Sequence, residues 1–225
     1  LSPNYANITL TDSATGGEII GYDFGVVLNG EVLGAKLVLD GVKVTSTAGE
    51  GVYFPGQENS SLTIKSGTEI TGSTGLGIKG GNVIIEDGAK ITGTRETSEV
   101  PDAAVSSGIS DLTGDAVYVE CGYNFPLSLT IQGGCFSSKA GQMVRMLFAE
   151  KTEVEETVSI TGGYFSAKPD STYLAKNYYV QPSDQEGYSY MVSNSAVAQI
   201  GADKYGTLAE AVAAAENNAT IKLLK

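Results

Sequence analysis

The segment Thr157–Ser166, TVSITGGYFS, consists of a short run of alternating apolar and polar residues, a Gly-Gly bend and a second, shorter apolar segment. Leu127–Ser137, LSLTIQGGCFS, is an earlier copy of this unit, and looser copies precede it. The second apolar residue of the run in each copy is, in chain order, Leu10, Leu39, Ile64, Ile85, Ile131 and Ile160. Four of the five steps between these positions are 21 to 29 residues long, which is typical of proteins built from stacked repeats.

Each repeat contains three short β-runs. In the repeat that starts at Ser61 these runs are Ser61–Ile64, Glu69–Thr71 and Leu76–Ile78. The glycines between or after these runs are Gly67, Gly72, Gly75, Gly80 and Gly81. We expect them at the corners, because glycine adopts a positive φ at little cost. Apolar and polar residues tend to alternate within a run, so one face is buried and the other is solvated. The sequence therefore predicts an all-β fold, a single-stranded parallel β-helix (solenoid). An all-β sandwich is the alternative, and it would make the repeat spacing a coincidence.

The predicted β-helix spans residues 1–166 and is interrupted once. Residues 95–114, RETSEVPDAAVSSGISDLTG, are rich in Ser, Asp, Glu and Gly, and they account for most of the one long step of 46 residues. We expect them to form a long loop that leaves the stack at a corner. Such a loop is either a tolerated surface insertion or the carrier of a function.

Residues 167–195 have a different character, because five tyrosines crowd a stretch that also contains proline and glycine. We expect two antiparallel strands here, Tyr178–Gln181 and Tyr188–Val192. A hairpin of this kind would cap the open end of the stack, where an uncovered strand edge invites aggregation. The alternative interpretation is a platform on which sugar rings stack.

Residues 196–225 read as the start of a following module. Val197–Ile200 is typical of a strand, and Thr207 with Glu210 has the spacing of a capping box that opens a helix. We expect one short α-helix over residues 207–216 and another strand after it.

The repeated units Ser159–Ser166 (SITGGYFS) and Thr130–Ser137 (TIQGGCFS) resemble repeats of secreted, cell-wall-linked surface proteins of Gram-positive bacteria. Those proteins look like right-handed parallel β-helices of the pectate-lyase-like type. Tyr173–Tyr179 resembles the segment that closes such a unit, and Ala196–Val212 resembles the one that opens the next. The resemblance implies a right-handed β-helix in a multi-module protein that is secreted, at the cell surface or in the cell wall, and it implies no particular chemistry.

The charge balance argues against two classes of partner. The chain has 14 basic and 26 acidic residues, a formal net charge of −12. Binding to nucleic acid needs clustered Lys and Arg, and so does binding to an anionic membrane surface. The sequence contains no run of 18 apolar residues, so we expect no membrane insertion. The oligomeric state stays open.

Signals for catalysis are few. The chain has no histidine, which excludes His-based triads and most zinc sites. A polysaccharide lyase or a glycosidase remains as the alternative function: the first would need carboxylates that hold Ca²⁺, and the second a pair of carboxylates across a cleft. Asp111 and Asp115 are the candidate Ca²⁺ ligands, near Glu120. The leading expectation is a non-catalytic surface module (a spacer, adhesin-like or glycan-binding) without a cofactor.

The third run of each repeat suggests where a polysaccharide or another host-surface ligand would bind. If its apolar residues point inward, one outward column holds Val27, Tyr53, Gly77, Tyr118 and Arg145. The next outward column holds Asn29, Pro55, Lys79, Glu120 and Leu147. Exposed tyrosines beside charged groups suit sugar rings, which pack on aromatic faces and hydrogen-bond at their edges. The sequence therefore predicts a glycan site of Tyr53, Tyr118, Arg145, Lys79 and Glu120, and the alternative is that a β-face simply favours tyrosine.

Two cysteines, Cys121 and Cys135, allow one disulfide between neighbouring coils. The alternative is a pair of small buried thiols, which is where free cysteine is commonly found.

Overall fold

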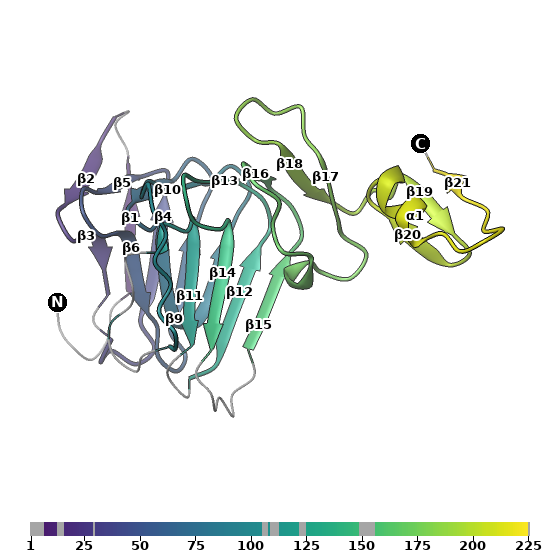
Figure 1. Ribbon diagram of the computed structural model, residues 1–225. Coiled ribbons are helices and arrows are strands. Elements are labelled where there is room, and N and C mark those ends of the chain that lie inside the picture. Colours follow the sequence, from purple (N-terminus) through teal and green to yellow (C-terminus); the bar gives the residue numbers. More distant parts are fainter. Residues whose placement is uncertain are drawn as a thin grey trace.

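The computed structural model describes residues 7–12, 16–28, 30–104, 108, 113–121, 125–148 and 156–224. The protein is mostly β, and its two large sheets are built chiefly from parallel strands. Figure 1 shows the strands stacked side by side from the N-terminal end to β15, followed by the β17–β18 hairpin and a small C-terminal group of elements. The prediction of an all-β protein with parallel strand pairing is thus confirmed.

Successive strands of the chain fall into three rows. The first row is β1 (Asn7–Thr11), β4 (Lys36–Asp40), β7 (Ser61–Ile64), the second half of β9 (Leu76–Ile85), β12 (Leu127–Ile131) and β15 (Glu156–Ile160). The second row is β2 (Glu18–Gly21), β5 (Lys43–Ser46), β8 (Glu69–Gly72), β10 (Lys90–Gly93), β13 (Cys135–Ser138) and β16 (Tyr164–Phe165). The third row is β3 (Phe24–Val27), β6 (Glu50–Pro55), the first half of β9, β11 (Val117–Cys121) and β14 (Val144–Phe148).

The register of the first row confirms the repeat that the spacing predicts. The six residues that define the repeat lie opposite one another on consecutive strands, in the order Leu10, Leu39, Ile64, Ile85, Ile131 and Ile160. All of them except the half-buried Leu10 have no more than a trace of exposed surface, and they form part of one continuous apolar core. Burial of one such side chain at every turn of the chain is what holds neighbouring repeats in register.

The Gly-Gly-x-Phe motif acts at the corner between the first and second rows. Gly134 and Gly163, the second glycine of each copy, have φ of +100° and +114°, a conformation that residues with a side chain rarely adopt. The chain then turns so that Phe136 and Phe165 enter the core, where their rings stack with centroids 5.0 Å apart. A Cβ at Gly163 would lie 3.2 Å from the Phe165 ring, so the glycine also leaves room for the aromatic pair.

The predicted tyrosine-rich hairpin is present. β17 (Tyr179–Pro182) and β18 (Tyr190–Ser193) pair antiparallel, and β18 pairs antiparallel with β16 at the end of the second row. Val180 and Val192 of the hairpin are buried and join the core. The 3-10 turn η2 (Ser171–Tyr173) precedes a bridge between Leu174 and Ile160, so the segment before the hairpin lies beside the last strand of the first row.

The C-terminal elements are β19 (Ala198–Ile200), β20 (Asp203–Tyr205), α1 (Leu208–Ala214) and β21 (Lys222–Leu223). The three strands form a small separate sheet, which Figure 1 shows beyond the hairpin. The predicted N-cap is present, because the Thr207 hydroxyl accepts a hydrogen bond from the Glu210 amide at 3.1 Å. The helix ends at Ala214, two residues before the predicted end, and β20 was not predicted from the sequence.

Candidate functional site

The third row contains the predicted glycan column, and its register is as predicted. Val27, Tyr53, Gly77, Tyr118 and Arg145 lie opposite one another on consecutive strands. Their exposure is not as predicted, because Tyr118 has 0% of its surface exposed. In the neighbouring column Lys79 and Glu120 are 1% and 0% exposed. The prediction of an open glycan face is therefore wrong at these three residues.

The long loop explains this burial. The Lys79 amine donates a hydrogen bond to the backbone carbonyl of Gly108, which belongs to the predicted loop 95–114. At the end of that loop the Thr113 hydroxyl lies 3.1 Å from the hydroxyl of Thr74. Two described parts of the insertion thus contact this region: Gly108 at Lys79 of the third row, and Thr113 at Thr74 just before β9. The alternation pattern alone places solvent at Lys79.

Two predicted site residues remain accessible in part. Tyr53 is half-buried and stacks on Phe24, with ring centroids 5.6 Å apart. The Arg145 side chain is 19% exposed and pairs with Asp115. With Tyr53 already stacked on a ring of the protein and Tyr118 buried, the two predicted tyrosines do not form a pair of aromatic platforms.

Lys79, Tyr118 and Glu120 form a buried cluster. The Lys79 amine lies 3.2 Å from Glu120 Oε1, and the Tyr118 hydroxyl donates to Glu120 Oε2 at 2.9 Å. Burial lowers the pKa of the Lys79 amine, although the Glu120 carboxylate opposes this. Burial, aided by the bond to Glu120, raises the pKa of the Tyr118 hydroxyl far above its ordinary value.

Asp115 and Arg145 form a second cluster beside the first. Arg145 binds both carboxylate oxygens, with Nε 2.7 Å from Oδ2 and Nη2 3.2 Å from Oδ1, and the Gln142 amide also donates to Oδ1. Burial raises the pKa of Asp115, and the hydrogen bond from Arg145 opposes that shift. The predicted Ca²⁺ ligand is thus bonded to protein donors.

The other half of the predicted Ca²⁺ site, Asp111, lies outside the described residues. Within the part of the chain that the structure describes, no group of three or more carboxylate or thiol side chains is placed to hold a metal ion.

The two cysteines are free thiols. Cys121 is buried in β11 of the third row, whereas Cys135 is half-buried in β13 of the second row. Of the two interpretations left open by the sequence, the disulfide is therefore wrong, and two free thiols describe the structure. Burial raises the pKa of Cys135, and a hydrogen bond with Tyr188 of the hairpin segment opposes it.

Tyr118 makes the fold sensitive to alkaline pH. In the unfolded chain its hydroxyl ionises near its ordinary pKa of about 10, whereas the folded state keeps the proton because its pKa is raised. The folded state then holds more protons, so stability that is present below pH 10 is lost as the pH rises. Above pH 10 we expect Tyr118 to lower the free energy of unfolding by about 1.4 kcal/mol per pH unit. The Tyr118→Phe variant should not show this contribution. Urea unfolding of both proteins across that range checks this, and equal slopes would contradict it.

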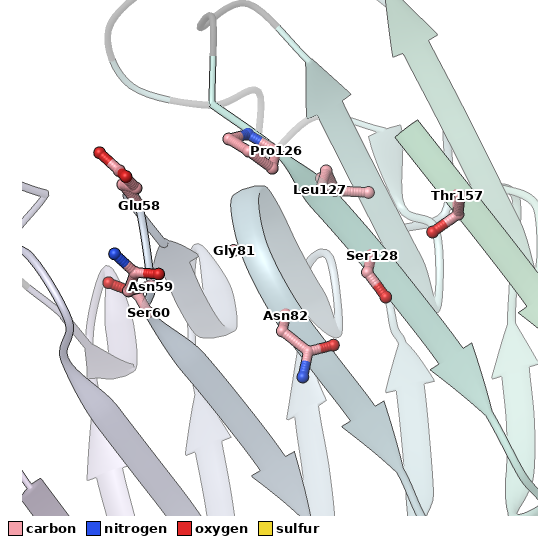
Figure 2. A pocket seen from close by; sticks show the side chains of 9 residues that line it. All are labelled: Glu58, Asn59, Ser60, Gly81, Asn82, Pro126, Leu127, Ser128 and Thr157. Atoms are coloured by element: carbon pink, nitrogen blue, oxygen red, sulfur yellow. The ribbon is translucent and has the colours of Figure 1, made fainter. Parts of the chain in front are cut away.

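A polar groove lies on the outer face of the first row and was not predicted. Its volume is about 590 Å³, and it is lined by Glu58, Asn59, Ser60, Gly81, Asn82, Pro126, Leu127, Ser128 and Thr157. Figure 2 shows Glu58, Asn59 and Ser60 on one side of Asn82, with Pro126, Leu127 and Ser128 on the other. Thr157 extends from the next strand beyond Ser128, so the lining spans four neighbouring segments.

Backbone geometry creates this groove. Gly81, with φ of +82°, donates its amide to the Pro126 carbonyl at 2.9 Å and adds no side chain to the floor. Gly80 lies so close to Gly56 that a Cβ on it would be 2.5 Å from the Gly56 carbonyl oxygen. These glycines let β9 pass from the third row to the first without a break, and the strands beside the bend leave a hollow.

The signal for the groove is visible in the sequence once the register is known. Asn82, Ser128 and Thr157, which line the groove, occupy one outward column on β9, β12 and β15. All three carry a hydroxyl or an amide. A search for aromatic residues, the signal used for glycan sites in the sequence, overlooks such a column.

Among the described residues no helix is long and apolar enough to cross a membrane. No protein-family model, curated protein or solved structure matches the chain.

Proposed function

We propose that this chain is a non-catalytic module of a secreted cell-surface protein, a right-handed parallel β-helix that binds a polysaccharide in the groove on its first row. The three rows of parallel strands in continuous register support the β-helix. The Gly-Gly-x-Phe repeats, through their resemblance to those of Gram-positive surface proteins, support the location.

The groove carries the binding proposal. Asn59, Asn82, Ser128 and Thr157 present amides and hydroxyls, which donate and accept hydrogen bonds as sugar hydroxyls do. The exposed Pro126 adds an apolar surface for the C–H face of a sugar ring. The volume of about 590 Å³ is that of an ordinary ligand site, and the spread over four segments suits an extended chain.

The lining favours binding over hydrolysis. Among the described residues that line the groove, Glu58 is the one carboxylate. Glycoside hydrolysis uses a pair of carboxylates that flank the scissile bond, one as acid and the other as base or nucleophile. A groove of amides and hydroxyls holds a sugar chain without supplying that pair.

The test is affinity electrophoresis of the chain in gels that contain plant, mucin or bacterial polysaccharides. We expect one glycan to retard the protein, and we expect Asn82→Ala with Ser128→Ala to weaken that binding about tenfold, because each lost hydrogen bond contributes about 0.5–1.5 kcal/mol. Thr71→Ala is the matched control, since Thr71 is an outward residue of β8 in the second row, outside the groove.

The control should leave the retardation unchanged. If the variant without Asn82 and Ser128 is retarded as strongly as the wild type, the binding site lies outside the groove. No retardation by any glycan would reject the binding proposal and leave a spacer as the function of the module.

A further inference from the structure

The exposed apolar side chains gather at the two ends of the chain. Among the described residues nine large apolar side chains are exposed, and four of them lie within residues 1–35 and three within residues 196–225. The four are Ile20, Tyr22, Val27 and Leu33, and the three are Leu208, Val212 and Leu223. Figure 1 shows β1–β3 and β19–β21 at opposite ends of the molecule, so neither set covers the other within one copy. Apolar surface that gathers in this way marks a site of contact with protein.

The first repeat, β1–β3, has an open side. Among the described strands β1, β2 and β3 pair with β4, β5 and β6 alone, so each has one free edge. The inward residues Leu10 and Ile19 are half-buried, whereas Leu39 and Val44, opposite them in the second repeat, are fully buried. A hollow of about 390 Å³ beside Leu10 and Ile19 reaches Val42 of the second repeat. The apolar interior is therefore accessible at this end.

The C-terminal unit, residues 196–225, contains a strand with the pattern of β1. Ala219–Leu223, ATIKL, repeats the spacing of Ala6–Leu10, ANITL, in which the leucine is the residue that defines the repeat. β21 lies at the edge of the small sheet, and β19 is its one partner among the described strands. Leu223 lies opposite the buried Ala198 but is itself exposed. The unit thus presents a first-row strand whose inward leucine is uncovered.

Helix α1 extends this apolar surface. It packs against β19 and β20, and Ala211 is its one buried residue. Leu208 and Val212, which are one turn apart on the helix, remain exposed. A surface helix normally turns such residues toward a core. The helix therefore has apolar residues to bury in a partner.

The charges of the two ends are compatible. Residues 1–35 contain four acidic residues and no lysine or arginine, whereas residues 196–225 contain three acidic and three basic residues. Lys204 and Lys222 lie on either side of Gln199 in the small sheet, and both are exposed. Because the chain carries a net charge of −12, two copies repel each other in most orientations. A contact between the acidic end and the end that bears these lysines avoids that repulsion.

We propose that copies of this chain associate head to tail, with the C-terminal unit of one copy seated on the first repeat of the next. β21 of one copy lies parallel to the free edge of β1 in the next and extends its first row. Leu223 of the one then lies beside Leu10 of the other, as Leu39 does on the opposite side of β1. α1 covers the accessible interior of the first repeat, and two free strand edges gain hydrogen-bond partners.

The test is sedimentation velocity of the full chain over a wide range of concentration, at physiological salt, where repulsion is screened beyond about 8 Å. We expect species larger than a dimer that grow with concentration, because a head-to-tail contact leaves a free end on every open assembly. Leu223→Glu should remove these species, since it places a charge in the apolar contact. Val100→Glu is the matched control, because Val100 is an exposed apolar residue away from both ends, and it should associate like the wild type.

A mixture of two variants tests the direction of the contact. Leu10→Glu blocks the first repeat and leaves the C-terminal unit intact, whereas Leu223→Glu does the reverse. Each should be monomeric alone, and together they should form a dimer that grows no further. Circular dichroism checks that Leu10→Glu is folded, and Ile20→Glu, at an exposed position of β2, is the second variant of this end.

Four results would overturn the proposal. The first is a wild type that stays monomeric at every concentration, and the second is a Leu223→Glu variant that still associates. The third is a mixture that forms no dimer. The fourth is a wild-type dimer that does not grow, because it would indicate a two-fold contact between identical surfaces.

Discussion

Replacement of Asp115 by alanine is expected to lower the free energy of unfolding by about 3–5 kcal/mol. The Asp115 side chain is fully buried and binds the Arg145 guanidinium through both of its oxygens. Its removal leaves a cation that is four-fifths buried without its partner, and it also removes the acceptor of the Gln142 amide. Urea unfolding followed by circular dichroism measures the change as a lower midpoint at constant slope.

Glu96→Ala is the matched control for this prediction. Glu96 also pairs with a cation, Lys139, but both side chains are more than half exposed. Because exposed ion pairs contribute little, we expect a change of about 0–1 kcal/mol. If the two variants lose similar stability, the Asp115–Arg145 pair does not hold the end of the long loop against the third row as the structure indicates.

The strand stack was predictable because its core rests on a local pattern. Each repeat places an apolar residue such as Leu39 or Ile64 at the same inward position, and burial of that residue fixes the register of the whole strand. The 46-residue step does not disturb the register of the first row, because β12 pairs directly with β9 and the inserted residues leave that row. The hairpin was predictable from its tyrosines and turn residues for similarly local reasons.

The burial of Tyr118 was not predictable in this way. Alternation along β11 shows which side chains point away from the core, but it does not show what lies over them. Charged residues such as Lys79 and Glu120 are rarely buried unless they are paired, so their presence in the outward column indicated solvent. The strand register places Lys79 beside Glu120. The contact of the Lys79 amine with the Gly108 carbonyl depends on the path of the loop, which alternation does not predict.

The glycines also show which features of the backbone can be predicted from the sequence and which cannot. Gly67 has the predicted positive φ, at +79°. At Gly72 the reason for glycine is different, because a Cβ there would lie 2.2 Å from the Gly51 amide nitrogen. The preference of glycine for a positive φ identifies glycines such as Gly67 from the sequence. The need for glycine at Gly72 follows only from the close approach of two turns of the chain that are distant in sequence. The same holds for Gly80, because a Cβ there would lie 2.5 Å from the Gly56 carbonyl oxygen.

Removal of the Phe136 ring is expected to lower the free energy of unfolding by about 3–5 kcal/mol, because Phe136→Ala leaves a cavity in the core between two repeats. Phe136 is fully buried and stacks on Phe165, its register partner on the next strand, with ring planes inclined by 13°. Urea unfolding measures the loss. Adding Phe165→Ala completes a double-mutant cycle, and we expect a coupling energy of about 0.5–1.5 kcal/mol beyond the burial of each ring.

Tyr22→Ala is the control for this second variant, because Tyr22 is an aromatic residue of comparable size that is 74% exposed. We expect its stability to stay within about 0.5 kcal/mol of the wild type. A loss at Phe136 no larger than that at Tyr22 would contradict the inference that the Gly-Gly-x-Phe motif exists to bring an aromatic ring into the core. A large loss with no coupling to Phe165 would show instead that each ring acts within its own repeat, so that the stacked pair does not bind consecutive repeats together.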